Sequence, residues 1–364
     1  MILSAKDKIN AFIIFLSFIM LPSCGDEYYQ KEDFSSVKKI DTHTHPNAES
    51  TALVEQAKAD NFILLAVNVD VPDYLDLPEQ QRLTLLQKEK FPEQIEFLSA
   101  FSLMDWDSAQ WEEQTIQQLK TSFERGALGI KLWKNIGMVY KDASGKFIMA
   151  DDPKFDKVIQ FVIDQNKTVM AHLGEPKNCW LPLEEMTVNN DREYFKEHPE
   201  YHMYLHPEYP SYEDQINARD RFVAKHADMR FVGAHLGSLE WDVKELAKRL
   251  DKFPNMAVDM AARIGHLQHQ SMTNRDELRN FFIQYQDRII YATDSGISAT
   301  SDPEETRKNL HQTWIDDWKF FATDEVMTAP EVNGNFQGLK LPKTVIDKIY
   351  YSNAIHWFLI PKRD

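Results

Sequence analysis

Apolar, β-rich runs recur along the chain, and segments with helical spacing lie between them. The runs occupy residues 37–43, 62–69, 95–103, 127–133, 168–174, 230–237, 255–262 and 288–294. Several runs, such as FILLAVNV at 62–69, are continuously apolar rather than alternating. That pattern is typical of parallel strands that are buried on both faces. The chain is therefore predicted to build one parallel sheet from these runs.

The intervening segments repeat apolar residues every three or four positions, which predicts one buried face on each helix. The clearest such segments lie at 108–126, 152–166, 241–253 and 272–288. Strands that alternate with helices predict an α/β fold, with a (β/α)₈ TIM barrel as the first choice. An open doubly wound sheet is the alternative. No Gly-rich phosphate-binding turn follows the first run, which disfavours that alternative.

Two connections are too long for bare loops. They follow the fifth and eighth runs, at residues 175–210 and 295–341, and both are rich in aromatic residues. Because barrels build their sites at the carboxyl ends of strands, we expect these insertions to form walls or lids over a pocket. Packing without any ligand contact is the alternative.

The first residues form a targeting signal rather than part of the fold. Two lysines precede the apolar run AFIIFLSFIML at 11–21, which is too short to span a bilayer, and LPSC ends at Cys24. The pattern resembles a bacterial lipoprotein signal, which is cut before the cysteine that becomes lipidated. We therefore predict a signal peptide at 1–23, a polar tether at 24–36 and the barrel at 37–364. An ordinary signal peptide is the alternative.

This resemblance implies an exported protein held to a bacterial membrane by a lipid on Cys24. Gly25 rather than Asp follows the cysteine, which favours the outer membrane, facing the periplasm or the exterior. The formal net charge of −16 argues against nucleic-acid binding, because phosphates need clustered Lys and Arg. The second cysteine, Cys179, leaves no intramolecular disulfide if Cys24 is lipidated.

Six ionisable residues fall at the carboxyl ends of the predicted strands. In chain order they are His43, His45, Lys131, His172, His235 and Asp294. His43 and His45 are two residues apart, so a strand directs both to the same face. Burying so many ionisable groups around one mouth is costly unless they are paired or bind a cation. Their joint placement predicts a metal site.

These residues resemble the amidohydrolase superfamily, and in particular its amidohydrolase-related branch. The resemblance covers most of residues 37–360 and rests on DTHTHP, AHLG twice, YATDSG and KIYYSNAIHWF. It implies four metal ligands, which are His43, His45, His172 and Asp294. His235 matches the histidine that binds a second metal or polarises the substrate. Lys131 matches a lysine that bridges two metals when carboxylated; a substrate clamp or an ordinary charge partner is the alternative.

The resemblance and the ligand chemistry together imply a mechanism. Imidazole-rich ligands favour Zn²⁺, as one or two ions, and bound water would lose its proton near neutral pH. Asp294 would take that proton, and His235 would stabilise the oxyanion. The expected activity is hydrolysis of a C–N, ester or lactone bond in a small molecule. With Mn²⁺, the same residues would suit non-oxidative decarboxylation of an aromatic or unsaturated acid.

Two residues outside this set are candidates for substrate binding. Arg263 follows the seventh run and could hold a substrate carboxylate, with a structural ion pair as the alternative. Trp180, in the first long connection, could stack on a ring, although such loops often pack on themselves. A non-catalytic, lipid-anchored binding protein is a further possibility. The oligomeric state stays open at this stage.

Overall fold

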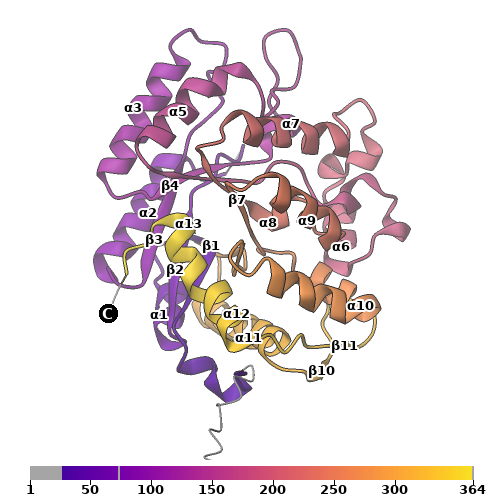
Figure 1. The fold of residues 1–364 in the computed structure, drawn as a ribbon. Coiled ribbons are helices and arrows are strands. Elements are labelled where there is room, and N and C mark those ends of the chain that lie inside the picture. Colours follow the sequence, from indigo (N-terminus) through magenta and orange to yellow (C-terminus); the bar gives the residue numbers. More distant parts are fainter. Residues whose placement is uncertain (1–26, 73, 363–364) are drawn as a thin grey trace, which may run out of the picture.

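Nine strands form one curled sheet in which every neighbouring pair is parallel. The computed structural model describes residues 27–72 and 74–362 (Figure 1). The strands follow the order β8-β7-β6-β5-β4-β3-β2-β1-β9. Their bounds are β1 Lys39–Asn47, β2 Phe62–Val67, β3 Ile95–Ala100, β4 Gly129–Leu132, β5 Thr168–Ala171, β6 Arg230–Gly233, β7 Met256–Asp259, β8 Ile289–Ile290 and β9 Ser295–Ser298. Each predicted run thus contains a strand.

The two edges of this sheet come together at β1. β8 pairs with β7, whereas β9 pairs with β1, and residues 291–294 join β8 to β9. Along this junction Thr42 N donates to Tyr291 O at 3.2 Å, and Asp294 N donates to His43 O at 2.9 Å. The sheet therefore curls until its last segment contacts its first strand.

Helices surround the curled sheet (Figure 1). Their bounds are α1 Ala52–Ala59, α2 Leu77–Lys90, α3 Trp111–Glu124, α4 Asn135–Met138, α5 Asp156–Asp164, α6 Asn189–Glu197, α7 Tyr212–Lys225, α8 Ala234–Gly237, α9 Val243–Lys252, α10 Ile264–Gln284, α11 Pro303–Ala322, α12 Lys343–Asp347 and α13 Asn353–Phe358. The helix predicted at 272–288 begins earlier, at Ile264, and is kinked at Asn274. A short antiparallel pair, β10 Val326–Met327 and β11 Phe336–Gln337, lies outside the main sheet.

An apolar layer fills the inside of the curl. It takes alternate residues of the strands, including Ile40, Ile63, Leu65, Val67, Leu98, Met170, Val232, Ala257 and Ile290. The same cluster contains Trp357 and Phe358 of α13, so this helix closes one end of the curl. There Thr168 Oγ1 donates to Trp357 O at 2.6 Å, and Trp357 Nε1 donates to Asp287 O at 3.0 Å. Because Thr168 begins β5 and Asp287 precedes β8, the closed end is the amino end of the strands.

The outer face of the sheet packs against the helices. Phe62 of β2 stacks on Trp314 of α11, with ring centroids 4.1 Å apart. α1 and α11 are far apart in sequence but lie side by side (Figure 1). Arg307 Nη1 donates to Glu55 Oε2 at 2.7 Å across that contact. The C-terminal helices thereby hold the first strands in place.

A β-bulge in β1 determines where its histidines point. Asp41 pairs with Leu64 but Thr44 pairs with Ala66, so β1 holds one extra residue between these positions. Ile40 belongs to the inner cluster, and simple alternation from it would direct His43 outward. The extra residue shifts the alternation, and His43 and His45 both line the inner cavity described below.

The two long connections differ in what they do. The first, between β5 and β6, contains α6 and short 3₁₀ helices, one of which carries the buried Cys179. The second runs mainly as α11, whose Trp314 and Trp318 are fully buried in the outer core. The expectation that both form walls of one pocket therefore holds for the first connection, as shown below, and not for the second.

The described part of the predicted tether contacts the fold. Tyr29 Oη donates to Asp347 Oδ1 at 2.7 Å, and Phe34 is buried. The predicted signal peptide and Cys24 lie outside the described residues. Within the residues that the structure describes, no helix combines the length and apolar character needed to cross a membrane.

Candidate metal centre

A cavity of about 620 Å³ opens at the carboxyl end of the sheet. Seven of the residues singled out from the sequence line it, namely His43, His45, Lys131, His172, His235, Arg263 and Asp294. Trp180 is not among the lining residues, and its ring packs edge-on against Tyr212 at 5.4 Å. The structure thus brings together residues that are spread over most of the chain.

Three side-chain atoms converge at the base of this cavity. Asp294 Oδ1 lies 3.0 Å from His45 Nε2 and 3.3 Å from His43 Nε2. The ligand atoms of these three residues all lie within 4.8 Å of one another. Two imidazole nitrogens and a carboxylate oxygen at this separation match the donor set that zinc prefers.

The hydrogen bonds of the other ring nitrogens fix how these histidines are presented. His45 Nδ1 lies 2.9 Å from Val67 O, and His235 Nδ1 lies 2.8 Å from Ala261 O. Because a carbonyl only accepts, each Nδ1 carries the proton and each Nε2 keeps a lone pair. Both rings are therefore ready to ligate an ion through Nε2.

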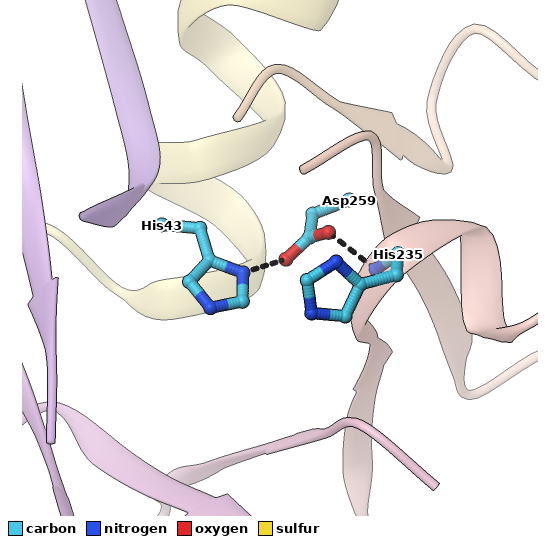
Figure 2. A group of neighbouring side chains, drawn as sticks. All are labelled: His43, His235 and Asp259. Atoms are coloured by element: carbon cyan, nitrogen blue, oxygen red, sulfur yellow. Dashed lines mark hydrogen bonds and ion pairs between the residues drawn. The ribbon is translucent and has the colours of Figure 1, made fainter. Parts of the chain in front are cut away.

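Asp259, at the end of β7, plays the same part for His43 (Figure 2). Its Oδ2 lies 3.1 Å from His43 Nδ1, and its Oδ1 accepts from the backbone N of His235 at 2.7 Å (Figure 2). Oδ1 also accepts from Ala261 N at 3.1 Å. Asp259, His43 and His235 form a second group with metal-binding spacing, but Asp259 does not line the cavity. Since both its oxygens are engaged, we read Asp259 as the residue that orients two histidines.

Sequence reasoning missed Asp259. It lies in the run NMAVDMAA, and a carboxylate at the carboxyl end of an otherwise apolar strand was the available signal. The same rule that selected His172 and His235 therefore applied to it.

Lys131 lies in the centre of the site. Its Nζ is 3.2 Å from His43 Nε2. That nitrogen is one of the three converging atoms that could bind an ion. Burial lowers the pKa of Lys131 to about 8, although Asp259 and Asp294 oppose that shift. At neutral pH a larger fraction of Lys131 is therefore the neutral amine than in a surface lysine.

His172 and Arg263 contain buried nitrogen atoms without hydrogen-bond partners. They are His172 Nε2 and Arg263 Nε. Burial lowers the pKa of His172 to about 4. Arg263 Nη1 donates only to the neighbouring Ala262 O, at 2.9 Å. His172 Nε2 lies 3.3 Å from Glu175 Oε2, so of these two nitrogens it is Arg263 Nε that indicates a cavity built to receive a ligand.

Three residues around the cavity adopt left-handed backbone conformations. The φ angles are +58° at His235, +52° at Ala262 and +72° at Asp294. Such conformations cost about 1–3 kcal/mol each outside glycine and cluster at functional sites. At His235 and Asp294 the turn directs the side chain into the cavity just after its strand ends.

Aromatic side chains supply part of the cavity lining. The first long connection supplies Tyr194 and Phe195 from α6, and the end of β4 is followed by Trp133. A planar or ring-containing small molecule fits such a lining best.

Comparisons with known proteins identify a family and similar folds. A family profile described as Amidohydrolase matches residues 100–360. None of the curated proteins searched matches this chain. Among solved structures, an uncharacterized TIM-barrel protein from Bordetella bronchiseptica superposes with a TM-score of 0.51 at 13% identity, covering 89% of this chain and 99% of that chain.

Two decarboxylases show similar folds. 2,6-Dihydroxybenzoate decarboxylase, complexed with 2,6-dihydroxybenzoate, gives a TM-score of 0.50 at 13% identity, over 89% of this chain and 99% of that chain. 5-Carboxyvanillate decarboxylase from Novosphingobium aromaticivorans was solved with manganese and a nitrobenzoic acid. It gives a TM-score of 0.50 at 12% identity, over 90% of this chain and 97% of that chain. At these identities the likeness concerns the fold.

Proposed function

Because this chain belongs to the amidohydrolase family, we propose that it is a metal-dependent hydrolase that cleaves a C–N, ester or lactone bond of a small molecule. The observation that carries the proposal is the convergence of His43 Nε2, His45 Nε2 and Asp294 Oδ1 at the base of a cavity. A hydrolase needs an activated water and a base in one place, and this arrangement provides positions for both.

The residues fit a divalent ion. His43, His45 and Asp294 would hold the first ion, and His172 would complete its ligand set. Lys131, after carboxylation, and His235 would hold a second ion. Zn²⁺ is the first choice because the donors are mostly imidazole nitrogens, and Mn²⁺ is the alternative. When bound, such an ion would lower the pKa of a water to about 7.

The protein's own groups then carry out the proton transfers. Asp294 accepts the proton of the attacking water, since its Oδ1 lies between two histidine nitrogens and its side chain is partly open to the cavity. It passes that proton to the leaving group as the bond breaks. Ala261 O holds the proton of His235 on Nδ1, so Nε2 presents a lone pair to the cavity, where it would bind a second ion.

Arg263 provides the recognition of the substrate. Its unpaired Nε and its position on the lining suit a carboxylate of the substrate. The aromatic wall of Trp133, Tyr194 and Phe195 contacts the substrate's apolar part. We therefore infer a small substrate with an anionic group at one end.

A substrate screen tests the hydrolase proposal. The zinc-loaded protein should turn over members of a panel of amides, lactones and esters that carry a carboxylate, and removal of the metal should abolish that turnover. Arg263→Met should raise KM for carboxylate-bearing members at least tenfold and leave neutral analogues unaffected. Absence of turnover across the panel with both zinc and manganese would argue against hydrolysis.

Non-oxidative decarboxylation of an aromatic acid is the second candidate. The buried Arg263 Nε and the flat aromatic wall favour it, because they suit an aromatic carboxylate. The folds of two aromatic-acid decarboxylases resemble this one. Carbon dioxide release from a panel of hydroxybenzoates, measured with manganese, distinguishes this reaction from hydrolysis.

We also propose that β8 and β9 serve as one interrupted strand. On that view the sheet is an eight-stranded (β/α)₈ barrel with insertions after strands five and eight. The hydrogen bonds of Thr42 and Asp294 to either side of the interruption support it. An experimental structure in which residues 289–298 pair continuously with β7 and β1 is the expected result.

The N-terminal sequence supports a further proposal about location. The apolar run before LPSC is the basis for expecting lipid attachment at Cys24 and anchoring to a bacterial outer membrane. Cys24→Ser should move the exported protein from the membrane fraction to the soluble fraction. A wild-type protein that is already soluble after export would contradict the anchor.

A further inference from the structure

A buried chain of three residues lies directly behind His172. Glu175 Oε1 pairs with Lys134 Nζ, and Glu175 Oε2 lies 3.3 Å from His172 Nε2. All three residues are buried, with exposed fractions of 5% for His172, 2% for Glu175 and 6% for Lys134. A carboxylate and an ammonium group are costly to bury, so their placement next to one candidate ligand calls for an explanation.

The local backbone brings Glu175 back towards His172. Gly174 between them has φ +88°, a conformation that other residues rarely adopt. Ser238 Oγ donates to Gly174 O at 2.6 Å and fixes this turn. The turn thus brings the Glu175 carboxylate within 3.3 Å of His172 Nε2, at the edge of the same cavity.

Lys134 is positioned to hold Glu175. It follows β4, and its Nζ lies over the rings of Tyr201 at 4.8 Å and Tyr194 at 5.5 Å. Aromatic faces enclose the ammonium group without competing for its hydrogen bonds. The carboxylate therefore offers one oxygen to Lys134 and the other to His172.

The four histidines of the site divide into two kinds by what lies behind them. Backbone carbonyls hold His45 and His235, whereas Asp259 holds His43. His172 has a carboxylate at hydrogen-bonding range, but its Nε2 is not aligned for a hydrogen bond in this structure. A proton on Nε2 directed at Glu175 would leave Nδ1 as the nitrogen that faces an ion.

We propose that Glu175, anchored by Lys134, is a positioning residue that sets the tautomer and orientation of His172 for metal binding. This inference rests on the proposed metal-dependent function. Neither Glu175 nor Lys134 ligates the ion or touches the reacting atoms in this role. Glu175 acts through His172, and Lys134 acts through Glu175.

Zinc affinity of purified, metal-free protein provides the first test, measured by competition with a chromophoric chelator. Glu175→Gln should weaken zinc binding 10- to 100-fold, the usual effect of removing a carboxylate behind a ligating histidine. Lys134→Met should weaken it by a similar factor. The double variant Glu175→Gln/Lys134→Met should be no weaker than Glu175→Gln alone, because Lys134 acts only through Glu175.

The double variant also guards against misfolding, since it removes both buried charges together. Glu240→Gln is the matched control. Glu240 is a fully buried carboxylate that faces a separate cavity, and glutamine can keep its bond from Lys177 N. Zinc affinity of this control should stay within twofold of the wild type.

Nitrogen-15 NMR of histidine-labelled, metal-free protein provides a second readout. The His172 ring should carry its proton on Nε2 in the wild type and shift towards Nδ1 in Glu175→Gln. A folded Glu175→Gln protein with zinc affinity within twofold and an unchanged tautomer overturns the proposal. Additive losses in the double variant overturn the role of Lys134.

The two readouts keep this inference separable from the proposed function. If the wild type binds neither zinc nor manganese, the metal-dependent function fails. The tautomer of His172 in the metal-free protein then still decides whether Glu175 controls this ring, because the unaltered tautomer in Glu175→Gln overturns the pairing on its own.

Discussion

The two ends of the curled sheet are built from the same strands, but they differ in whether buried polar groups have hydrogen-bond partners. At the amino end, Asn353 Nδ2 donates to Gln286 O at 2.6 Å and Ile289 O at 2.7 Å, and Trp357 Nε1 has its own carbonyl acceptor. At the carboxyl end, the buried Nε of Arg263 lines the cavity and has no hydrogen-bond partner. The amino end is therefore complete by itself, whereas the carboxyl end is arranged to gain partners from a ligand.

The backbone shows the same difference. Among the described residues that line the cavity, His235, Ala262 and Asp294 have positive φ angles. The inner side of the amino end is instead filled by Trp357 and Phe358 of α13. Packing at the amino end thus offsets the free-energy cost of the strained backbone and unpaired groups at the carboxyl end. Changes at the carboxyl end should affect ligand binding, and changes at the amino end should affect stability.

The largest expected effect at the carboxyl end is loss of metal. His43→Ala/His45→Ala removes two of the three converging ligand atoms and should abolish stoichiometric binding of zinc, because only Asp294 and His172 remain of the proposed ligands. Elemental analysis of protein purified without chelators measures this, and circular dichroism should show an intact fold.

The matched control removes two other histidines. His198 and His206 lie in the first long connection, and neither lines the cavity. The His198→Ala/His206→Ala protein should retain wild-type zinc content. Equal metal content in both double variants would show that the ion does not bind at His43 and His45.

Asp294→Asn separates ligand binding from proton transfer. Asparagine keeps the size and one coordinating oxygen but cannot accept a proton at working pH. Turnover should fall roughly 10²- to 10⁴-fold while most of the metal remains. Single-turnover rates on the best substrate from the panel measure this loss. A metal-loaded variant with nearly wild-type turnover would leave His235 or Lys131 as the base.

Sequence pattern predicted the strands well because burial on both faces leaves a continuous apolar signal. It also brought His43, His45, His172 and Asp294 to one end, since the carboxyl ends of parallel strands meet at the same edge. The structure confirms that these side chains share a cavity. Their roles stay predictions, as does lipidation of Cys24.

Three features were beyond sequence pattern for physical reasons. The bulge that turns His43 inward depends on how β1 pairs with β2, which no local propensity encodes. The second long connection was expected over the pocket, but Trp314 packs on Phe62 instead, because aromatic composition indicates burial without indicating where. Glu175 orients towards His172 only through a turn at Gly174.

At the amino end the largest effect should fall on stability. Phe358 is fully buried in the inner cluster, so Phe358→Ala removes a large side chain and leaves a cavity. The free energy of unfolding should fall by about 3–5 kcal/mol. Urea unfolding measures this change. Zinc affinity of the folded variant should match the wild type, and a tenfold loss of affinity would contradict the separation of the two ends.

Asp317 should make stability depend on pH without affecting the cavity. Burial raises its pKa to about 8 from 3.8, and its Oδ2 accepts from Tyr291 Oη at 2.6 Å. A raised carboxyl pKa means that the folded state holds a proton that the unfolded state has lost. This contribution is full below about pH 4, declines as pH rises and is gone above about pH 8.

Asp317→Asn has no proton to lose, so its stability should vary less than that of the wild type between about pH 5 and about pH 8. Urea unfolding of the metal-free proteins at both pH values tests the slope. Parallel pH dependence in the two proteins would show that Asp317 does not titrate in this range.

The smallest predicted effect compares two neighbouring alanines. Ala262 has φ +52° and lines the cavity. Ala261 is buried and does not have a positive φ. Glycine adopts positive φ freely, so Ala262→Gly should relieve left-handed strain and raise the free energy of unfolding by about 1 kcal/mol. Ala261→Gly gains no such relief, loses a buried methyl group and should lower it by about 1 kcal/mol. Opposite signs in urea unfolding would locate strain at the cavity edge, and a destabilised Ala262→Gly protein would show that the backbone there is relaxed.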